Sequence, residues 1–217
     1  MKPEFPPLYA ILSADLLSSP DPNYAEEFAV LLANAGVGII QYRNKHATAR
    51  TLLDVSTKIS AALAKTSARF IVNDRPDIAR LSGANGVHVG QDDLPVDYAR
   101  AVCRKIISPT QQTAVPPKNF WIGISTHTLE QVRSAAATTA DYIAIGPIFA
   151  TTTKQNHEAA VGTDFIRQAR ELTDKPLVAI GGITTATAEE VFRAGADSIA
   201  VARDLIRAEN PGARAAE

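Results

Sequence analysis

Short apolar runs alternate with longer segments of mixed polarity along almost the whole chain. The runs are nearly continuous in apolar character, as is typical of strands that are covered on both faces. We predict strands at Leu8–Leu12, Gly38–Tyr42, Arg69–Val72, Gly86–Val89, Phe120–Ile124, Tyr142–Ile145, Leu177–Ile180 and Ser198–Val201. We predict helices at Asn23–Ala35, Ala47–Ala64, Pro76–Leu81, Pro95–Lys105, Thr128–Ala137, Thr163–Leu172, Thr185–Ala194 and Arg203–Glu209.

This alternation predicts an α/β fold with parallel strands inside and helices outside. Eight strand–helix units in 217 residues leave about 27 residues for each unit, which is near the minimum for a βαβ repeat. The pattern favours a single-domain (β/α)8 TIM barrel over residues 1–217. An open doubly wound sheet is the alternative, but no G-x-G-x-x-G motif follows the first strand. We expect a polar loop at Ile107–Lys118 and a frayed tail at Ala213–Glu217.

Composition and charge narrow the function classes. Hydrophobic residues make up 46% of the chain and charged residues 21%, as in ordinary globular proteins. The net charge of −1 argues against a nonspecific grip on nucleic acid or on an anionic membrane. No apolar run reaches the roughly 18 residues of a membrane helix, and the start of the chain has no signal-peptide core. Cys103 is the single cysteine, so we expect no internal disulfide and a cytoplasmic protein. A homo-oligomer is compatible with this sequence.

Active sites of such barrels lie where strands end and βα loops begin. After the second predicted strand, Gln41, Arg43 and Lys45 stand at alternate positions, so an extended backbone directs them to one side. Two cations and an amide there suit an anionic group, and a guanidinium offers a planar fork for it. The alternative is a solvated loop with two ordinary surface charges.

Two further strands each bring a carboxylate to the same rim. Asn73 and Asp74 follow the third strand, and Asp93 follows the fourth. Hard oxygen ligands beside cations suggest a Mg²⁺ site. The alternative is helix capping, because Pro76 and Pro95 open the helices just beyond. We interpret His88 as a packed or hydrogen-bonded side chain rather than a metal ligand.

The next two loops carry hydroxyls and one more cation. Ser125 and His127 follow the fifth strand; the serine can donate to a phosphate oxygen, whereas His127 suits either a general base or a helix entry. The sixth strand leads to Thr151, Thr153 and Lys154 in a loop longer than usual for a βα connection. Such length is typical of a lid or binding loop, and a flexible threonine-rich loop is the alternative.

The last two strand ends form a second candidate anion site. Gly181-Gly182 lacks Cβ atoms, so its backbone can approach a ligand closely, although the same dipeptide also occurs in plain tight turns. The loops after strands seven and eight are the usual phosphate site of a β/α barrel. With two anion sites and no strong nucleophile between them, the pattern suggests diphosphate as a leaving group.

These motifs resemble those of the thiamine phosphate synthase family over about Leu8 to Ala208. The matching segments are Gln41–Lys45, Val72–Asp74, His88–Leu94, Gly123–His127, Gly146–Lys154 and Ala179–Ile183. The resemblance implies a small (β/α)8 barrel that joins 4-amino-5-hydroxymethyl-2-methylpyrimidine diphosphate to a thiazole phosphate, which is a carboxylated tautomer in some organisms. The implied products are thiamine phosphate and diphosphate, formed by a dissociative, Mg²⁺-assisted reaction.

The resemblance also implies roles for individual residues. It implies that the pyrimidine diphosphate is bound by Gln41, Arg43, Lys45, Asn73, Ser125 and Lys154, of which Arg43, Lys45, Ser125 and Lys154 are the implied catalytic residues. It implies that Asp74 and Asp93 hold Mg²⁺. The implied thiazole contacts are Thr151 and Thr153, and the implied phosphate contacts are Gly182, Ala202 and Arg203.

Two segments depart from the family pattern. Ala202-Arg203 stands where the family usually has Ile-Ser, so Arg203 either reaches the phosphate or points outward. Ser13-Ala14-Asp15 replaces the familiar Thr-Asp after the first strand. The rival interpretations are a thiazole tautomerase, which would use His127 and need no Mg²⁺, and a noncatalytic barrel that binds a phosphate ligand.

Overall fold

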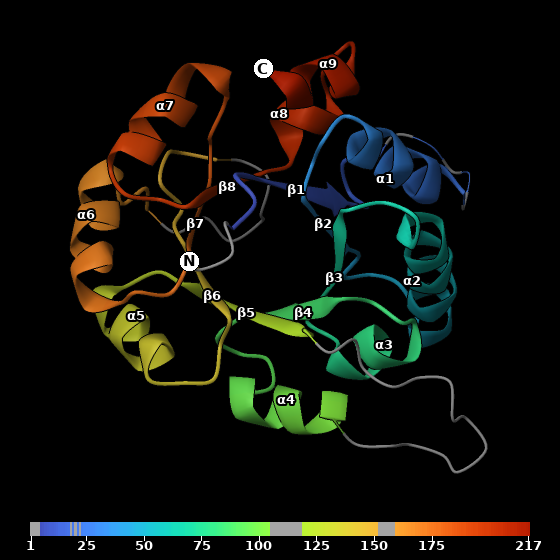
Figure 1. Cartoon of the computed structure of the whole chain (residues 1–217), viewed down its shortest axis with the longest axis horizontal. Coiled ribbons are helices and arrows are strands. Elements are labelled where there is room, and N and C mark those ends of the chain that lie inside the picture. Colours follow the sequence, from blue (N-terminus) through green and yellow to red (C-terminus); the bar gives the residue numbers. More distant parts are fainter. Residues whose placement is uncertain (1–4, 18, 20, 22, 105–118, 152–158) are drawn as a thin grey trace.

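Eight parallel strands close into a barrel in the order β1 to β8, with helices around the outside (Figure 1). This computed structural model describes residues 5–17, 19, 21, 23–104, 119–151 and 159–217. The strands are β1 (Leu8–Ser13), β2 (Ile39–Arg43), β3 (Arg69–Asn73), β4 (Gly86–Val89), β5 (Trp121–Thr126), β6 (Tyr142–Ile145), β7 (Leu177–Ile180) and β8 (Ser198–Val201). The predicted (β/α)8 fold is therefore confirmed.

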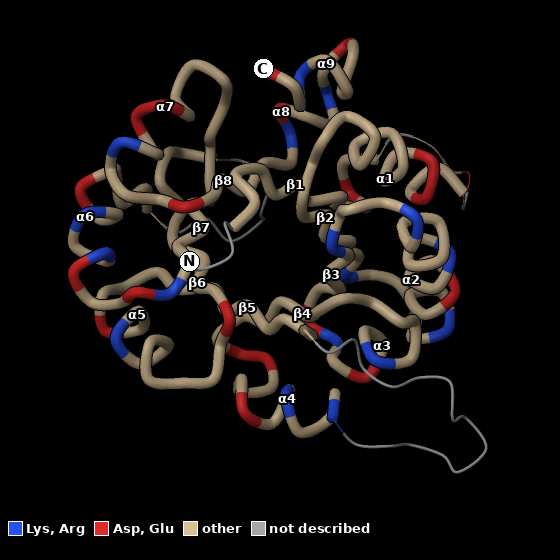
Figure 2. Tube along the Cα trace, viewed as in Figure 1, with Lys and Arg blue, Asp and Glu red and all other residues tan. Residues whose placement is uncertain are grey.

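The helices follow the strands in turn. They are α1 (Tyr24–Asn34), α2 (Ala49–Leu63), α3 (Pro76–Leu81), α4 (Val96–Arg104), α5 (Leu129–Ala136), α6 (Thr163–Leu172), α7 (Thr185–Arg193), α8 (Arg203–Ile206) and α9 (Pro211–Ala216). Many of the Lys, Arg, Asp and Glu positions occur along these helices (Figure 2). No helix in the described part of the chain is long and apolar enough to cross a membrane.

Alternation along the strands divides the core into two layers. In β1, Ala10 and Leu12 pack toward the helices, whereas Tyr9 and Ile11 belong to a separate buried cluster inside the barrel. Successive side chains of a strand point to opposite faces, so each strand feeds both layers. Ser13 is the next residue with the parity of Tyr9, so β1 ends with a small polar side chain at the barrel mouth.

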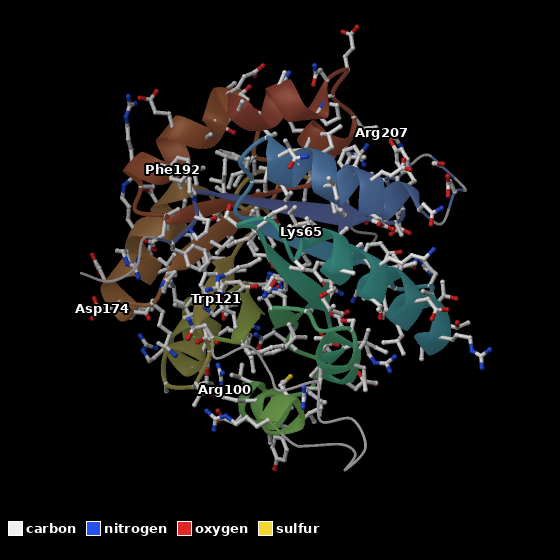
Figure 3. All side chains as sticks on the ribbon, turned by 45° about the vertical axis from the view of Figure 1, so that its right-hand side comes forward. Lys65, Arg100, Trp121, Asp174, Phe192 and Arg207 are labelled. Atoms are coloured by element: carbon white, nitrogen blue, oxygen red, sulfur yellow. The ribbon has the colours of Figure 1, made fainter. Side chains whose placement is uncertain are left out.

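Aromatic side chains fill the opposite end of the barrel. The ring of Phe5 stacks on Trp121 with centroids 5.1 Å apart, and the Arg69 guanidinium lies 4.0 Å from the Trp121 ring centroid. Figure 3 shows Trp121 among the side chains near the middle of the molecule, whereas Asp174 lies at its outer edge. This packing closes the end of the barrel away from the βα loops.

The C-terminal segment corrects one prediction. Instead of a frayed tail, residues Pro211–Ala216 form helix α9. The Asn210 side chain accepts a hydrogen bond from the Ala213 amide at 3.0 Å, and Pro211 occupies the first turn. Both are favourable at a helix start. The helix packs on α1 and α8, which supplies the stability that its short sequence lacks (Figure 1). The predicted loop Ile107–Lys118 falls outside the described residues.

Candidate active site

A cavity of about 520 Å³ opens at the carboxyl ends of the strands. Its lining includes Ser13 from β1, Arg43 from β2, Ser125 from β5 and Gly182 after β7. This is the face on which β/α barrels place their active sites. Six of the predicted site residues therefore meet around one space: Arg43, Ser125, Thr151, Gly182, Ala202 and Arg203. Gln41, Lys45, Asn73, Asp74 and Asp93 are not among its lining residues.

The Gln41 side chain is fixed inside the barrel beside this cavity. The Tyr9 hydroxyl donates to Gln41 Oε1 at 2.8 Å, and Gln41 Nε2 donates to Asn73 Oδ1 at 3.3 Å. Gln41 is 3% exposed, so its amide depends on these partners for its hydrogen bonds. The pair Gln41 and Asn73 forms the inner edge of the rim made by β2 and β3.

A chain of buried hydrogen bonds connects this pair to Ser125. The Tyr9 and Tyr142 hydroxyls lie 2.9 Å apart, and Tyr142 Oη lies 3.1 Å from His88 Nδ1. His88 Nε2 then lies 2.8 Å from Ser125 Oγ. Burial raises the pKa of the Tyr9 phenol well above its ordinary value, and burial also raises the pKa of the Tyr142 phenol. Both phenols therefore stay protonated and neutral around pH 7.

This series of hydrogen bonds confirms the interpretation of His88 as a hydrogen-bonded side chain. It also contains Tyr9 and Tyr142, two residues that were not predicted from the sequence. Tyr9 and Tyr142 lie inside strands that were chosen for apolar character, so they did not stand out as site residues. Their signal was the alternation itself, because both lie at inward positions of their strands.

The two cations of the β2 end face carboxylates. Arg43 Nη1 lies 3.5 Å from Asp15 Oδ2, and the Arg43 side chain is 14% exposed. Lys45 Nζ lies 3.2 Å from Asp74 Oδ2, with its side chain half exposed. The structure thus brings Gln41, Arg43 and Lys45 to one rim, with the amide deepest and the ammonium outermost.

Asp74 and Asp93 form a carboxylate pair. Burial and the neighbouring Asp74 carboxyl raise the pKa of Asp93, whereas the Gly90 amide and Lys45 oppose this rise. The Gly90 N–H donates to Asp93 Oδ2 at 2.7 Å. A carboxyl whose charge is disfavoured by a like charge gains from a cation placed between the two.

The backbone at Asp74 is itself unusual. Asp74 has φ of 61°, in the left-handed region that residues other than glycine seldom occupy. Its amide donates to the His88 carbonyl at 2.7 Å, which holds the loop in place. Arg75, rather than Asp74, occupies the N-cap position of α3, and that helix has no side-chain cap. The capping alternative is therefore wrong for Asp74.

The two carboxylates at this rim are residues that could hold a magnesium ion. Over the described residues, no cluster of three or more His, Cys, Asp or Glu side chains could hold a metal ion. Magnesium needs less, because it usually keeps several waters and takes one or two carboxylates together with substrate phosphate oxygens. Asp74 and Asp93 provide such a pair.

The rim after β6, β7 and β8 is shaped by backbone rather than by side-chain pairs. Gly181 and Gly182 have φ of 105° and 63°. A Cβ on Gly182 would lie 2.6 Å from the Ala150 carbonyl oxygen, so any side chain there would displace the neighbouring loop. The Phe149 amide donates to the Gly181 carbonyl at 3.0 Å, which ties that loop to the glycine turn.

This glycine turn leads directly into the first turn of α7. At the start of this helix the Thr184 N–H donates to Thr187 Oγ1 at 3.0 Å. Helix N-termini favour anions because their first N–H groups and the helix dipole point at the ligand. Gly181 and Gly182 line the cavity beside this N-terminus, so we name the turn and the first turn of α7 the glycine cup.

The remaining predicted residues divide into two groups. Thr151, Ala202 and Arg203 line the cavity, so Arg203 borders the site. Thr153 and Lys154 fall outside the described residues, and their roles stay predictions. His127 also lines the cavity, with Nδ1 2.6 Å from the Gly146 carbonyl oxygen. Its backbone N–H donates to Gln131 Oε1 at the entry to α5, which agrees with the helix-entry alternative, whereas a role as general base stays a prediction.

Comparison with known proteins identifies the family of this chain. A family model described as Thiamine monophosphate synthase matches residues 8–205. A thiamine-phosphate synthase of Koribacter versatilis is 45% identical over 99% of this chain and 94% of its own length. A thiamine-phosphate synthase of Chloroflexus aurantiacus is 38% identical over 96% of this chain and 88% of its own length.

A solved structure agrees as well. The thiamine phosphate pyrophosphorylase of Pyrococcus furiosus superimposes with a TM-score of 0.80 at 28% identity, covering 97% of this chain and 92% of that one. Match, identity and coverage together assign the chain: it belongs to the thiamine monophosphate synthase family of enzymes.

Proposed function

We propose that this enzyme couples 4-amino-5-hydroxymethyl-2-methylpyrimidine diphosphate with a thiazole phosphate to give thiamine phosphate and diphosphate. The observation that carries the proposal is one cavity with two different anion-binding ends. Arg43, beside Lys45 and the carboxylate pair, lies at one end, and the glycine cup lies at the other. Two phosphorylated substrates can therefore meet with their reacting atoms between the ends.

The cavity suits a dissociative reaction better than covalent catalysis. Cys103 lies on α4 outside the barrel, and burial raises the pKa of its thiol to about 12, so it supplies no nucleophile. In the proposed reaction the pyrimidine–oxygen bond breaks first, and its electron pair leaves with the diphosphate. The thiazole nitrogen then donates its electron pair to the resulting cation. Catalysis of this kind consists of charge stabilisation and positioning.

The first end would hold the pyrimidine diphosphate. Arg43 and Lys45, with Lys154, would neutralise charge on the leaving diphosphate, and a guanidinium can bind two phosphate oxygens at once. Gln41, Asn73 and Ser125 would orient the pyrimidine ring, since the buried hydrogen-bond chain fixes their side chains.

Magnesium would lie at the same end. Asp74 and Asp93 would hold it, and the bound ion would supply positive charge to the leaving group. The support for this assignment is the paired carboxylates, the raised pKa of Asp93 and the left-handed backbone conformation of Asp74. Backbone strain of this kind is concentrated at functional sites.

The second end would hold the thiazole phosphate. Gly182 and the backbone of Ala202 and Arg203 would bind its phosphate group at the start of α7 and α8, while Thr151 and Thr153 would contact the ring. A thiazole tautomerase, which would act through His127, is the rival candidate. It leaves the carboxylate pair and the Arg43 and Lys45 cations without a role, so the synthase reaction explains more of the rim. We also propose a cytoplasmic location, which rests on the single cysteine.

The deciding experiment is an assay of the purified protein with both substrates, in Mg²⁺ and in chelator. Thiamine phosphate and diphosphate formed only with Mg²⁺ would support the proposal. Thiazole tautomerisation without any coupled product would overturn it and would leave Asp74 and Asp93 without a metal role.

A further inference from the structure

The last helix of the chain brings a cation to the cavity. Arg214 lies on α9 and is one of the residues that line the cavity. Helix α9 follows residue 205, where the match to the family model ends. The cavity wall that α9 forms thus lies outside the segment that the family model matches.

The Arg214 side chain extends from α9 toward the start of α7 and toward α8. Its Nη1 donates to Thr185 Oγ1 at 3.2 Å and lies 3.4 Å from Asp204 Oδ2. Its Nε lies 3.5 Å from Glu217 Oε2. Thr185 is the first residue of α7, three residues after Gly182. The guanidinium thus lies next to the glycine cup, although Arg214 belongs to α9, the last helix of the chain.

This end of the cavity carries an excess of positive charge. Arg203, Arg207 and Arg214 line it, and Asp204 is the acid found among the described lining residues. The arginines come from α8, α9 and the turn between them, which lie side by side (Figure 1), and Figure 3 labels Arg207 beside these helices. Asp204 and Glu217 both pair with Arg214, so three arginines face two carboxylates and this end of the cavity keeps a net positive charge that suits an anion such as a phosphate monoester.

We propose that α9 completes the phosphate end of the cavity and that Arg214 is a binding residue for the phosphate monoester of the second substrate. This inference rests on the proposed function for the identity of the ligand. The glycine cup supplies N–H groups at the start of α7, and Arg214 adds a planar charged donor across from them. Its contacts with Asp204 and Thr185 hold the guanidinium in place before the ligand arrives.

A purely structural role for Arg214 makes a different prediction. If Arg214 only connects α9 to α8, its loss would lower the affinity for every ligand of the cavity equally. If Arg214 binds phosphate, its loss would lower the affinity for phosphorylated ligands alone. The affinity for the thiazole phosphate and for the unphosphorylated thiazole alcohol therefore separates the two roles.

The test uses the full chain with Arg214→Gln and Arg214→Lys, and Arg167→Gln as the control on α6, where the arginine is exposed and pairs with Asp164. We expect Arg214→Gln to raise KM for the thiazole phosphate roughly 10- to 100-fold, the loss of one charged hydrogen bond. We expect kcat, KM for the pyrimidine diphosphate and the Kd of the thiazole alcohol by calorimetry to change less than twofold. Arg214→Lys should recover part of the loss, and Arg167→Gln should match the wild type.

Asp204→Asn keeps the inference testable if Arg214→Gln folds poorly. It breaks the same ion pair but keeps the cation, so it should raise KM for the thiazole phosphate much less than Arg214→Gln does. The inference is overturned if Arg214→Gln changes this KM less than twofold, if it weakens the alcohol equally, or if Asp204→Asn raises KM as far as Arg214→Gln does.

Failure of the proposed function would look different. The wild type would then form no thiamine phosphate with any substrate pair, whatever residue stands at position 214. Titration with inorganic phosphate would still decide the inference: weaker binding by Arg214→Gln than by Arg167→Gln supports it, and equal binding overturns it.

Discussion

The rim made by β2 to β5 presents side chains to the cavity, whereas the rim made by β6 to β8 presents mainly backbone. On the first rim, Gln41 and Ser125 are joined through buried hydrogen bonds, and the carboxylate pair contacts Lys45. On the second rim, glycines with positive φ shape the glycine cup, and charge arrives from the C-terminal helices.

Under the proposed function, this difference would assign two recognition tasks to the two rims. A diphosphate that leaves during the reaction would need charge concentrated at one place, which side chains and a metal ion would supply. A phosphate that anchors its substrate would need shape and N–H donors from the glycine turn at a helix start, to which we propose that Arg214 adds charge. Substitutions should therefore act mainly on turnover at the first rim and mainly on KM at the second.

The largest expected effect comes from Asp93→Asn. Loss of one carboxylate of the pair should lower kcat about 10²- to 10³-fold at limiting Mg²⁺, since metal charge on a leaving group is worth several kcal/mol. The KM for the thiazole phosphate should hardly change. Steady-state kinetics across a Mg²⁺ titration measure both.

The control for Asp93→Asn is Asp92→Asn, which changes the adjacent, exposed carboxylate. Equal losses in the two variants would remove the metal assignment.

The folded chain also disfavours the charged form of Asp93, because its pKa is raised. The contribution of protonated Asp93 to the free energy of unfolding is thus lost as the pH rises through that pKa. Asp93→Asn should therefore match or exceed the Tm of the wild type in chelator at pH 7.

Arg43→Ala should have the next largest effect. We expect it to weaken pyrimidine diphosphate binding by about 1.5–3 kcal/mol, as for a charged hydrogen bond. The affinity of Arg43→Lys should lie between those of the wild type and Arg43→Ala, because lysine keeps the positive charge but lacks the planar guanidinium that binds two oxygens at once. Calorimetry measures the affinity, with Arg50→Ala on the exposed start of α2 as the control. An unaltered Kd for Arg43→Ala would place the diphosphate elsewhere.

Gly182→Ala tests the second rim. A left-handed residue other than glycine costs roughly 1–2 kcal/mol, and the new Cβ would press on the Ala150 carbonyl. We expect KM for the thiazole phosphate to rise about 5- to 30-fold, with kcat little changed. Gly36→Ala is the matched control, since Gly36 has φ of 94° and no atom within 4 Å of its Cβ position. A similar KM rise in both variants would show that strain alone, rather than the shape of the cup, is responsible.

The smallest expected effect is that of Tyr142→Phe. It removes the hydroxyl between Tyr9 and His88, so the side chains of Gln41 and Ser125 lose part of their support. We expect kcat/KM for the pyrimidine diphosphate to fall about 2- to 10-fold, the range of one neutral hydrogen bond. Adding Tyr9→Phe to Tyr142→Phe should lower kcat/KM less than Tyr9→Phe does in the wild type, because the two tyrosines share one hydrogen bond.

The control for this pair is Tyr98→Phe, whose ring is 68% exposed on α4. Full additivity of Tyr9→Phe and Tyr142→Phe would show that the buried chain does not act as a unit.

The sequence alone determined the barrel and most of its rim. The strands Gly86–Val89, Tyr142–Ile145, Leu177–Ile180 and Ser198–Val201 were predicted with their observed limits, because each is a short, largely apolar run with a polar or glycine residue on at least one side. Position at the end of a strand was enough to select Arg43, Asp74 and Ser125, since parallel strands bring their carboxyl ends to one rim.

The tertiary structure alone decided which of these groups are connected. Tyr9 and Tyr142 are 133 residues apart and meet only because the barrel closes, so no local pattern could pair them. Helix α9 escaped prediction for a related reason: its six residues have no apolar period, and its stability comes from packing on α1 and α8. Periodicity records how each segment meets the core, whereas contacts across the barrel depend on where distant segments finally lie.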